Sequence, residues 1–225
     1  MTANEIYSWD ITYLLSPIKG QYYYLYMVMD IYSRKIVGWQ VHDCESSAHA
    51  ADLIADIAYR EKIDKNQLVI HSDNGSPMKG ATLRAKMIDL EISPSYSRPR
   101  VSNDNPYSES LFKTVKYHHT FPENPFTCLN EARSWVEQFV HWYNDEHQHS
   151  AIKFVTPNQR HNGNEWFLPM QKALDKVRYS RERFSVLSAD FFILLGCLRQ
   201  LQRTKYCANK SSHCLILMKV LKQYR

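Results

Sequence analysis

The feature that most constrains the fold is a series of three strand-like segments at the start of the chain, joined by short polar breaks. Apolar and polar side chains largely alternate over residues 7–15, which is the period of a β-strand. Residues 22–29 are apolar almost without interruption, as expected of a strand covered on both faces. Residues 36–41 form a third such segment. Three consecutive strands with short connections predict an antiparallel meander.

Helix-like and strand-like segments alternate after the meander. Apolar residues recur at helical spacing over residues 51–58, and a short apolar strand follows at 68–70. The same pair of patterns then repeats, as a helix over about 79–90 and a strand near 92–97. Strands joined through helices are typical of parallel pairing, so the later strands are expected to add parallel members to the sheet.

The end of this region is predicted to be helical. Residues 98–105 read as a loop, and because proline fits the first turn of a helix, a helix is expected to begin at Pro106. A final long helix carries an apolar stripe from Ala132 to Tyr143, and Thr127 is a predicted cap for it. The predicted fold class is therefore α/β, with a mixed five-stranded sheet flanked by helices.

Three carboxylates stand out as candidate functional groups, each on a different predicted element. Asp10 lies on the first strand, on the opposite face from Trp9 and Ile11. Asp73 follows the strand at 68–70, and Glu109 lies in the helix that begins at Pro106, with 35 residues between them. Since the carboxyl ends of parallel strands share one edge of a sheet, we expect Asp73 to lie at that edge.

Carboxylates gathered in one place need a cation. Two of them repel each other by roughly 4 kcal/mol at 4 Å with an effective dielectric constant of about 20. A divalent cation removes this penalty, and oxygen ligands suit Mg²⁺ or Mn²⁺. Two such ions can stabilise both the attacking and the leaving oxygen of a phosphodiester substitution. We therefore predict that Asp10, Asp73 and Glu109 are the catalytic metal ligands, with two ions as the expected number.

Simpler interpretations of the three carboxylates stay open at this point. Asp10 could be a polar residue on an exposed strand face, and Asp73 could serve only the turn that Asn74 favours. Glu109 could form a surface ion pair with Lys113, four residues later on the same helix.

The positive charge of the chain is unevenly distributed. The formal net charge is +5, but residues 165–225 alone hold 12 Lys or Arg against 4 Asp or Glu. The preceding part is therefore slightly acidic, and its basic residues near Glu109 are local. Phosphate backbones are held mainly by Lys and Arg, so these residues are predicted to contact DNA. They are Arg98, Arg100, Lys113 and Lys116.

Composition excludes several classes of protein. No stretch approaches the roughly 18 consecutive apolar residues of a membrane span, and the N-terminus lacks the pattern of a signal peptide. We therefore expect a cytoplasmic protein with no membrane partner. The five cysteines are odd in number and include no Cys-x-x-Cys pair, which disfavours a disulfide framework or a zinc knuckle. No Ser/His/Asp or Cys/His arrangement indicates a nucleophilic side chain, and no small-molecule substrate is expected.

With these residues in view, the chain resembles the catalytic core of bacterial insertion-sequence transposases of the retroviral-integrase type, which has a ribonuclease-H-like fold. The resemblance covers about residues 7–163. It rests on a set of motifs whose order and spacing are far more specific than any one of them. The motifs are Trp9–Thr12, Met29–Trp39, His71–Gly75, Ser97–Pro99, Asn103–Ser110, Tyr143–Asn144 and Thr156–Pro157.

The resemblance implies specific roles for the matching residues. Asp10, Asp73 and Glu109 match the metal-binding triad of the family, and Lys116 matches the basic residue that lies against the DNA end. The implied reaction is DNA strand cleavage by activated water, followed by attack of the freed 3′-hydroxyl on another strand. The implied cofactor is Mg²⁺ or Mn²⁺, and the implied partners are transposon ends, target DNA and further copies of the chain.

The domain boundaries are predicted from where the resemblance stops. Residues 1–163 are the expected catalytic core, and residues 164–225 are an unfamiliar basic extension. Because relatives carry helical DNA-recognition modules ahead of the first Asp, and only nine residues precede Asp10, the chain is expected to be a truncated transposase. Two alternatives stay open. One is a catalytically incompetent DNA-binding or oligomerising fragment that interferes with full-length transposase, and the other is an RNA–DNA hybrid nuclease.

Overall fold

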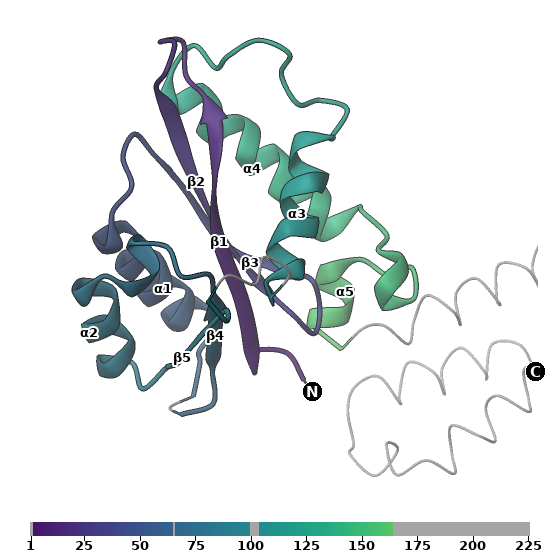
Figure 1. Cartoon of the computed structure of the whole chain (residues 1–225). Coiled ribbons are helices and arrows are strands. Elements are labelled where there is room, and N and C mark those ends of the chain that lie inside the picture. Colours follow the sequence, from purple (N-terminus) through teal and green to yellow (C-terminus); the bar gives the residue numbers. More distant parts are fainter. Residues whose placement is uncertain (1, 65, 100–103, 164–225) are drawn as a thin grey trace, which may run out of the picture. The chain divides into compact units, whose positions relative to one another are not determined.

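The computed structural model describes residues 2–64, 66–99 and 104–163. Its centre is a five-stranded sheet (Figure 1). Three strands form the predicted antiparallel meander, and two short strands run parallel to the first, in the order β3-β2-β1-β4-β5. The strands are β1 (Ile6–Leu15), β2 (Tyr22–Asp30), β3 (Ile36–His42), β4 (Val69–Ser72) and β5 (Ser93–Tyr96). The predicted mixed sheet is confirmed, with strand ends within two residues of those expected.

Helices α1 to α4 also correspond to predicted segments. The apolar stripe of the last long helix is confirmed, since Ala132, Val136, Phe139 and Tyr143 are all buried. A short helix, α5, was not predicted because five residues are too few to show a helical period. The helices are α1 (Ser47–Arg60), α2 (Ala81–Asp89), α3 (Pro106–Lys116), α4 (Leu129–Asp145) and α5 (Pro157–His161). Within the described residues, no helix is both long and apolar enough to cross a membrane.

The predicted cap of α4 is wrong by one position. Cys128 occupies the N-cap and makes no side-chain capping bond. Thr127 lies just outside the helix, where its backbone N–H and its hydroxyl both donate to Glu131 at 2.6 Å. Thr127 is therefore linked to the first turn of α4 through the side chain of Glu131, and it does not cap the helix backbone itself.

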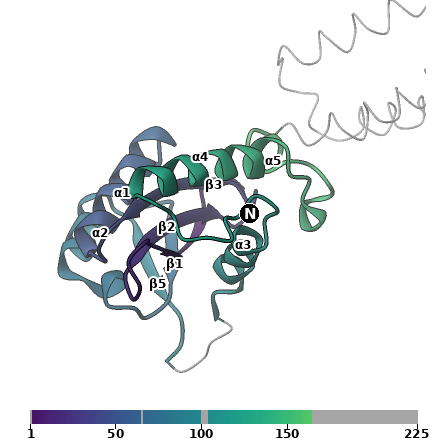
Figure 2. The same ribbon diagram turned by 90° about the horizontal axis from the view of Figure 1, so that it is seen from above.

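The helices cover both faces of the sheet (Figures 1 and 2). Helices α1 and α2 pack on one face, where their apolar side chains join those of Tyr7, Trp9 and Tyr26 in one buried cluster. Helices α3 and α4 pack on the opposite face and form a second cluster with side chains that include Leu14 and Leu25. Strand β2 contributes to both clusters, which explains why its sequence is apolar almost without interruption.

Candidate active site

Asp10 and Asp73 lie on two neighbouring parallel strands. The pairing of β1 with β4 runs from Ile6 opposite Val69 to Trp9 opposite Ser72. The next residue on each strand is Asp10 and Asp73, at the point where β4 ends. Because side chains alternate along a strand, Asp10 points to the face opposite Trp9, whose ring is in the cluster beneath α1 and α2. The two carboxylates therefore belong to the sheet face that α3 covers.

Helix α3, which carries Glu109, is fixed to β1 by a buried polar cluster immediately before Asp10. The hydroxyl of Ser8 donates to Asn105 Oδ1 at 2.5 Å and lies 2.7 Å from the hydroxyl of Ser108. The side-chain amide of Asn105 donates to the carbonyl of Trp9 at 3.3 Å. All these side chains are buried. The first turn of α3, and with it Glu109, is therefore held beside the strand that carries Asp10.

The pKa of Asp10 responds to the charges of the other two carboxylates. Burial raises the pKa of Asp10 to about 6, against the opposing effect of the Ile11 N–H, which donates to its carboxylate at 2.8 Å. The negative charges of Asp73 and Glu109 raise the pKa further. Within the described residues, no Lys, Arg or His forms an ion pair with any of the three. Their mutual repulsion is therefore left uncompensated by the protein.

The three carboxylates do not form a complete metal-binding group in this structure. In residues 2–64, 66–99 and 104–163, no three His, Cys, Asp or Glu side chains converge tightly enough to hold an ion. Glu109 is exposed, while Asp10 and Asp73 are half-buried. Like charges oppose closer approach, so this is the arrangement expected from the chain's own side chains.

The simpler interpretations of these residues find little support. Asp10 is not on an exposed strand face, and Glu109 makes no ion pair with Lys113. Asp73 is held from outside its own turn, because Ser97 Oγ donates to its Oδ1 at 2.6 Å. Asn74 reinforces this link by donating to the carbonyl of Ser97 at 2.6 Å.

His71 lies near Asp73 but is fully occupied by other partners. Its Nδ1 is 3.0 Å from the hydroxyl of Ser95 on β5, and its Nε2 is 3.1 Å from the carbonyl of Asp104. The imidazole therefore joins β4, β5 and the segment leading to α3. This agrees with a positioning role rather than with metal ligation.

The four predicted DNA-contacting residues have different surroundings. Lys113 and Lys116 are exposed on α3, and neither pairs with a carboxylate in the described part of the chain. Arg98 instead closes the base of its loop, since its guanidinium makes two hydrogen bonds of 2.8 and 2.9 Å to Asp104. This partner holds the pKa of Asp104 near 2. Arg100 lies outside the described residues.

Two groups around the site were not predicted from the sequence. Glu45, in the segment before α1, is a fourth carboxylate whose negative charge raises the pKa of Asp10. No sequence pattern relates it to the other three. The second group is the anchor made by Ser8, Asn105 and Ser108. The last two belong to a motif that carries the family resemblance, which could have marked them as structural partners of Glu109.

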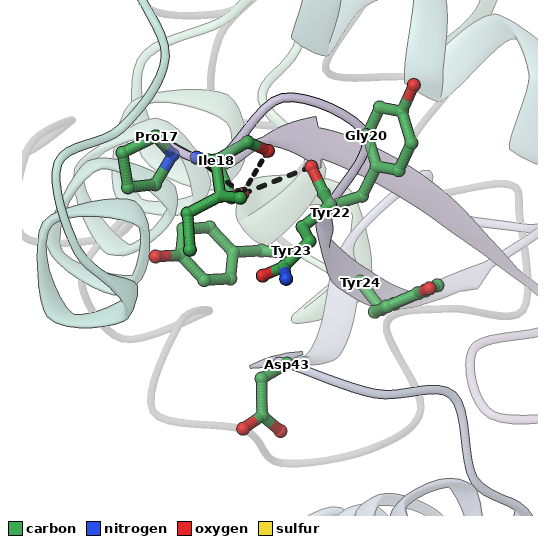
Figure 3. Close-up of a pocket in the computed structure, with 9 residues that line it drawn as sticks. Pro17, Ile18, Gly20, Tyr22, Tyr23, Tyr24 and Asp43 are labelled. Carbon is green, nitrogen blue, oxygen red and sulfur yellow. Dashed lines mark hydrogen bonds between the residues drawn. The ribbon is translucent and has the colours of Figure 1, made fainter.

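A shallow cavity of about 220 Å³ lies elsewhere, at the turn between β1 and β2 (Figure 3). Its walls include Pro17, Ile18 and Tyr22, with Asp43 at one side. None of the predicted catalytic carboxylates lines it. The candidate active site at the end of β4 is therefore separate from this cavity.

Comparison with protein families agrees with this geometry. Two family models, both described as integrase core domain, match residues 2–102 and 90–157. The chain belongs to the integrase core domain family. The two matches together cover every element from β1 to the start of α5, including Asp10, Asp73 and Glu109.

Curated proteins that are similar to this integrase core include insertion-sequence transposases. The chain is 26% identical over 155 residues to the transposase of IS904 from Lactococcus lactis, covering 68% of the chain and 60% of the relative. It is 28% identical over 162 residues to transposase InsF of IS3A from Escherichia coli, covering 72% and 55%. A putative transposase of IS986/IS6110 from Mycobacterium tuberculosis is 23% identical over 158 residues, covering 68% and 56%. The chain thus spans little more than half the length of these relatives.

Solved structures show the same fold for the integrase core. The HTLV-2 integrase catalytic core domain in complex with magnesium aligns with a TM-score of 0.53 and 17% identity, over 72% of this chain and 98% of that one. A chain in the structure of the simian T-cell lymphotropic virus intasome in complex with PP2A regulatory subunit B56 gamma aligns with a TM-score of 0.58 and 18% identity, over 71% of this chain and 55% of that one. The predicted ribonuclease-H-like fold is confirmed.

Proposed function

We propose that this integrase core catalyses metal-dependent cleavage and joining of DNA strands, with Asp10, Asp73 and Glu109 as the metal ligands. One observation carries the proposal. The pKa of Asp10 is raised first by burial and then by the negative charges of Asp73 and Glu109, and no described Lys, Arg or His forms an ion pair with any of the three. Uncompensated carboxylates on a surface that accepts a polyanion make sense only with cations between the two.

The side chains present fit a divalent cation. All three donors are carboxylate oxygens, the ligands preferred by Mg²⁺ and Mn²⁺, and no sulfur or imidazole ligand competes among them. Glu109 and Asp73 would have to approach Asp10 to bind the same ion, and a cation reverses the repulsion that opposes this approach. When bound, the ions would supply charge stabilisation at the reacting phosphate and an activated water.

The chain's own residues would supply position and charge. Ser97 orients Asp73, and the anchor formed by Ser8 and Asn105 fixes the helix that presents Glu109. Lys113 and Lys116 would hold the phosphate backbone along α3. With a pKa of about 6, Asp10 is mostly ionised at neutral pH and able to act as a ligand. We also propose that the chain works as a homo-oligomer, because two DNA ends must be joined together to one target.

The test uses a branched DNA in which a free 3′-hydroxyl lies beside a phosphodiester of the adjoining strand. This substrate assays the reverse of strand joining, so it does not depend on recognition of transposon ends. The full chain, with Mg²⁺, is expected to resolve the branch. Asp73→Asn should reduce the rate by at least about 100-fold, because a ligand that stabilises transition-state charge is worth several kcal/mol.

The matched control is Asp89→Asn, an exposed carboxylate on α2. It removes the same charge and should keep the wild-type rate. If Asp73→Asn and Asp89→Asn react equally fast, the catalytic assignment is wrong. If the wild-type chain binds the branched DNA without resolving it in Mg²⁺ or Mn²⁺, the chain is a binding fragment rather than an enzyme.

A further inference from the structure

Arg34, in the turn between β2 and β3, has no anionic partner among the residues that the structure describes. Its guanidinium lies over the ring of Tyr107 on α3, with Cζ 4.1 Å from the ring centroid. Its Nε is buried and has no hydrogen-bond partner within the described residues. No described carboxylate forms an ion pair with it. A buried donor of this kind costs free energy unless something accepts its hydrogen bond.

A second buried polar atom without a hydrogen-bond partner among the described residues is Nδ1 of His149. Burial lowers the pKa of His149, and the charges of His147 and Arg34 lower it further, which places the two side chains within electrostatic range. Tyr143 lies 6.5 Å from His149 between ring centroids, and the charge of Arg34 opposes the effect of burial, which raises the pKa of Tyr143. Arg34 and His149 each have one buried polar atom without a hydrogen-bond partner among the described residues.

The carboxylate nearest in sequence does not serve this region. Asp30 ends β2, with its side chain on the sheet face of Tyr26 and Val28, whereas Tyr107 and Tyr143 pack on the opposite face. Oδ2 of Asp30 is used by Ser33 and His161, while its Oδ1 is buried without a hydrogen-bond partner among the described residues. Arg34 nevertheless forms no ion pair with Asp30, and its guanidinium lies over Tyr107 at the start of α3.

The backbone of Arg34 points to a functional reason for this placement. Its φ angle is +67°, the left-handed region that a non-glycine residue adopts at a cost. Such strain persists where the surrounding structure requires a particular side-chain position. Tyr107 is the second residue of α3, and the first backbone N–H groups of a helix favour an anion. A guanidinium there is unfavourable by itself and favourable with an anion bound beside it.

We propose that Arg34, whose guanidinium lies over the ring of Tyr107, binds a backbone phosphate of DNA. The inference rests on the proposed function for the identity of its ligand. A guanidinium whose face is stacked on an aromatic ring keeps its edge free for the bidentate contact that phosphate accepts. Tyr107 and Glu109 lie on nearly opposite sides of the first turn of α3, roughly 10 Å apart across the helix. A phosphate bound by Arg34 would therefore differ from the reacting one and lie a short distance along the DNA backbone from it.

The test measures binding of a short fluorescent duplex to the full chain by anisotropy, with Ca²⁺ present, over a series of salt concentrations. Arg34→Gln is expected to raise Kd about tenfold at moderate salt and to reduce the slope of log K against log salt by about 0.9, the value for one lost phosphate contact. Arg34→Lys should keep the slope but raise Kd about threefold, because lysine lacks the planar fork. Tyr107→Leu should fall between wild type and Arg34→Gln.

The matched control is Arg84→Gln, which removes the same charge from an exposed position on α2, on the other face of the sheet. It should leave Kd and slope close to wild type. If Arg34→Gln and Arg84→Gln bind equally well, the inference is wrong. Circular dichroism and thermal melting check the folding of each variant, and Arg34→Lys carries the test if Arg34→Gln does not fold.

A free anion is distinguished from DNA by following the Nε–Hε resonance of Arg34 in NMR spectra. A shift on adding duplex, with none on adding inorganic phosphate at the same phosphate concentration, supports a DNA contact. Equal shifts with both would make this a general anion site and overturn the proposal. The branched-DNA assay of the wild-type chain measures catalysis, whereas the anisotropy and NMR experiments measure binding. Failure to resolve the branch despite Arg34-dependent binding would therefore remove only the proposed catalytic function.

Discussion

Two acidic clusters in this protein differ in what surrounds them. At the start of α3, Asp10, Asp73 and Glu109 have no cationic partner in the described chain, and burial and mutual repulsion raise the pKa of Asp10 to about 6. At the other end of β1, Glu61 is fully compensated. The hydrogen bond from His161 lowers its pKa to about 2, against the effect of burial, and Lys35 adds to the lowering.

The compensated cluster is a structural joint. Asp30 is completely buried at the end of β2, and its Oδ2 accepts from the backbone N–H and the hydroxyl of Ser33. His161 of α5 bridges the two acids, with Nδ1 3.3 Å from Asp30 and Nε2 3.1 Å from Glu61. Lys35 completes the cluster, 2.9 Å from Glu61. These contacts join β2, the end of α1 and α5.

The difference shows how to recognise functional carboxylates in a fold of this kind. Burial does not separate the two clusters, since Asp30 is more deeply buried than Asp10. What separates them is charge balance. Asp30 and Glu61 are provided with cationic partners by the protein, whereas the three proposed metal ligands form no ion pair within the described residues. Three experiments would break or sharpen this comparison.

The largest effect is expected from changing the divalent cation. Mg²⁺ or Mn²⁺ should support DNA cleavage, whereas Ca²⁺ should support DNA binding with no detectable cleavage, because its larger and more flexible coordination does not fit the reacting geometry. Each cation should also raise the melting temperature of the wild-type chain through binding to the folded state, but not that of Asp73→Asn. Gel assays of cleavage and thermal melts make the measurement. Robust cleavage in excess chelator would refute the metal assignment.

A smaller effect, on stability alone, is expected at the compensated cluster. His161→Gln should lower the free energy of unfolding by about 2–4 kcal/mol, because it leaves Asp30 without a cationic partner and Glu61 with Lys35 alone. Although burial opposes it, hydrogen bonding to Asp30 and Glu61 raises the pKa of His161. Its contribution is therefore complete below the unfolded pKa of about 6.5 and is lost as the pH rises through the folded value. Urea denaturation should show a larger deficit at pH 6 than at pH 9.

The control for this prediction is His141→Gln. His141 pairs with Asp145 on the exposed surface of α4, 3.1 Å away. Such a pair contributes only a few tenths of a kcal/mol, at most about 1 kcal/mol. A deficit for His161→Gln no larger than that of His141→Gln, or one independent of pH, would show that the buried cluster is not a charged joint.

The smallest effect, opposite in sign, is expected at Asp10. Because its folded pKa is raised, its contribution to stability is present below the unfolded pKa of about 4 and lost as the pH rises through about 6. Asp10→Asn should therefore stabilise the metal-free protein by about 1–2 kcal/mol at pH 8, with no gain at pH 4. Urea denaturation at both values checks this. A gain equally large for Asp89→Asn would mean that general surface charge, not the site, is responsible.

Much of the fold and of the site was accessible from the sequence because the signals involved are local. The period of two over 7–15 and the apolar run over 22–29 reflect which face of a strand is covered, and both strands formed as predicted. Asp10, Asp73 and Glu109 were marked by their residue type and by the motifs around them. The cap of α4 was misplaced because Thr127 and Cys128 are neighbours, and only the path of the chain decides which one enters the helix.

The sequence by itself determined the elements and the residue types of the candidate site, since periodicity and motif are properties of neighbours along the chain. Only the tertiary structure decided that β4 pairs with β1 in the register that sets Asp73 beside Asp10, and that Ser8 holds the helix of Glu109. It also decided which charges are balanced. Electrostatic compensation depends on distance through space. His161 and Asp30 are far apart in sequence but form an ion pair, whereas Arg34 is near Asp30 in sequence and lies over Tyr107 instead of pairing with it.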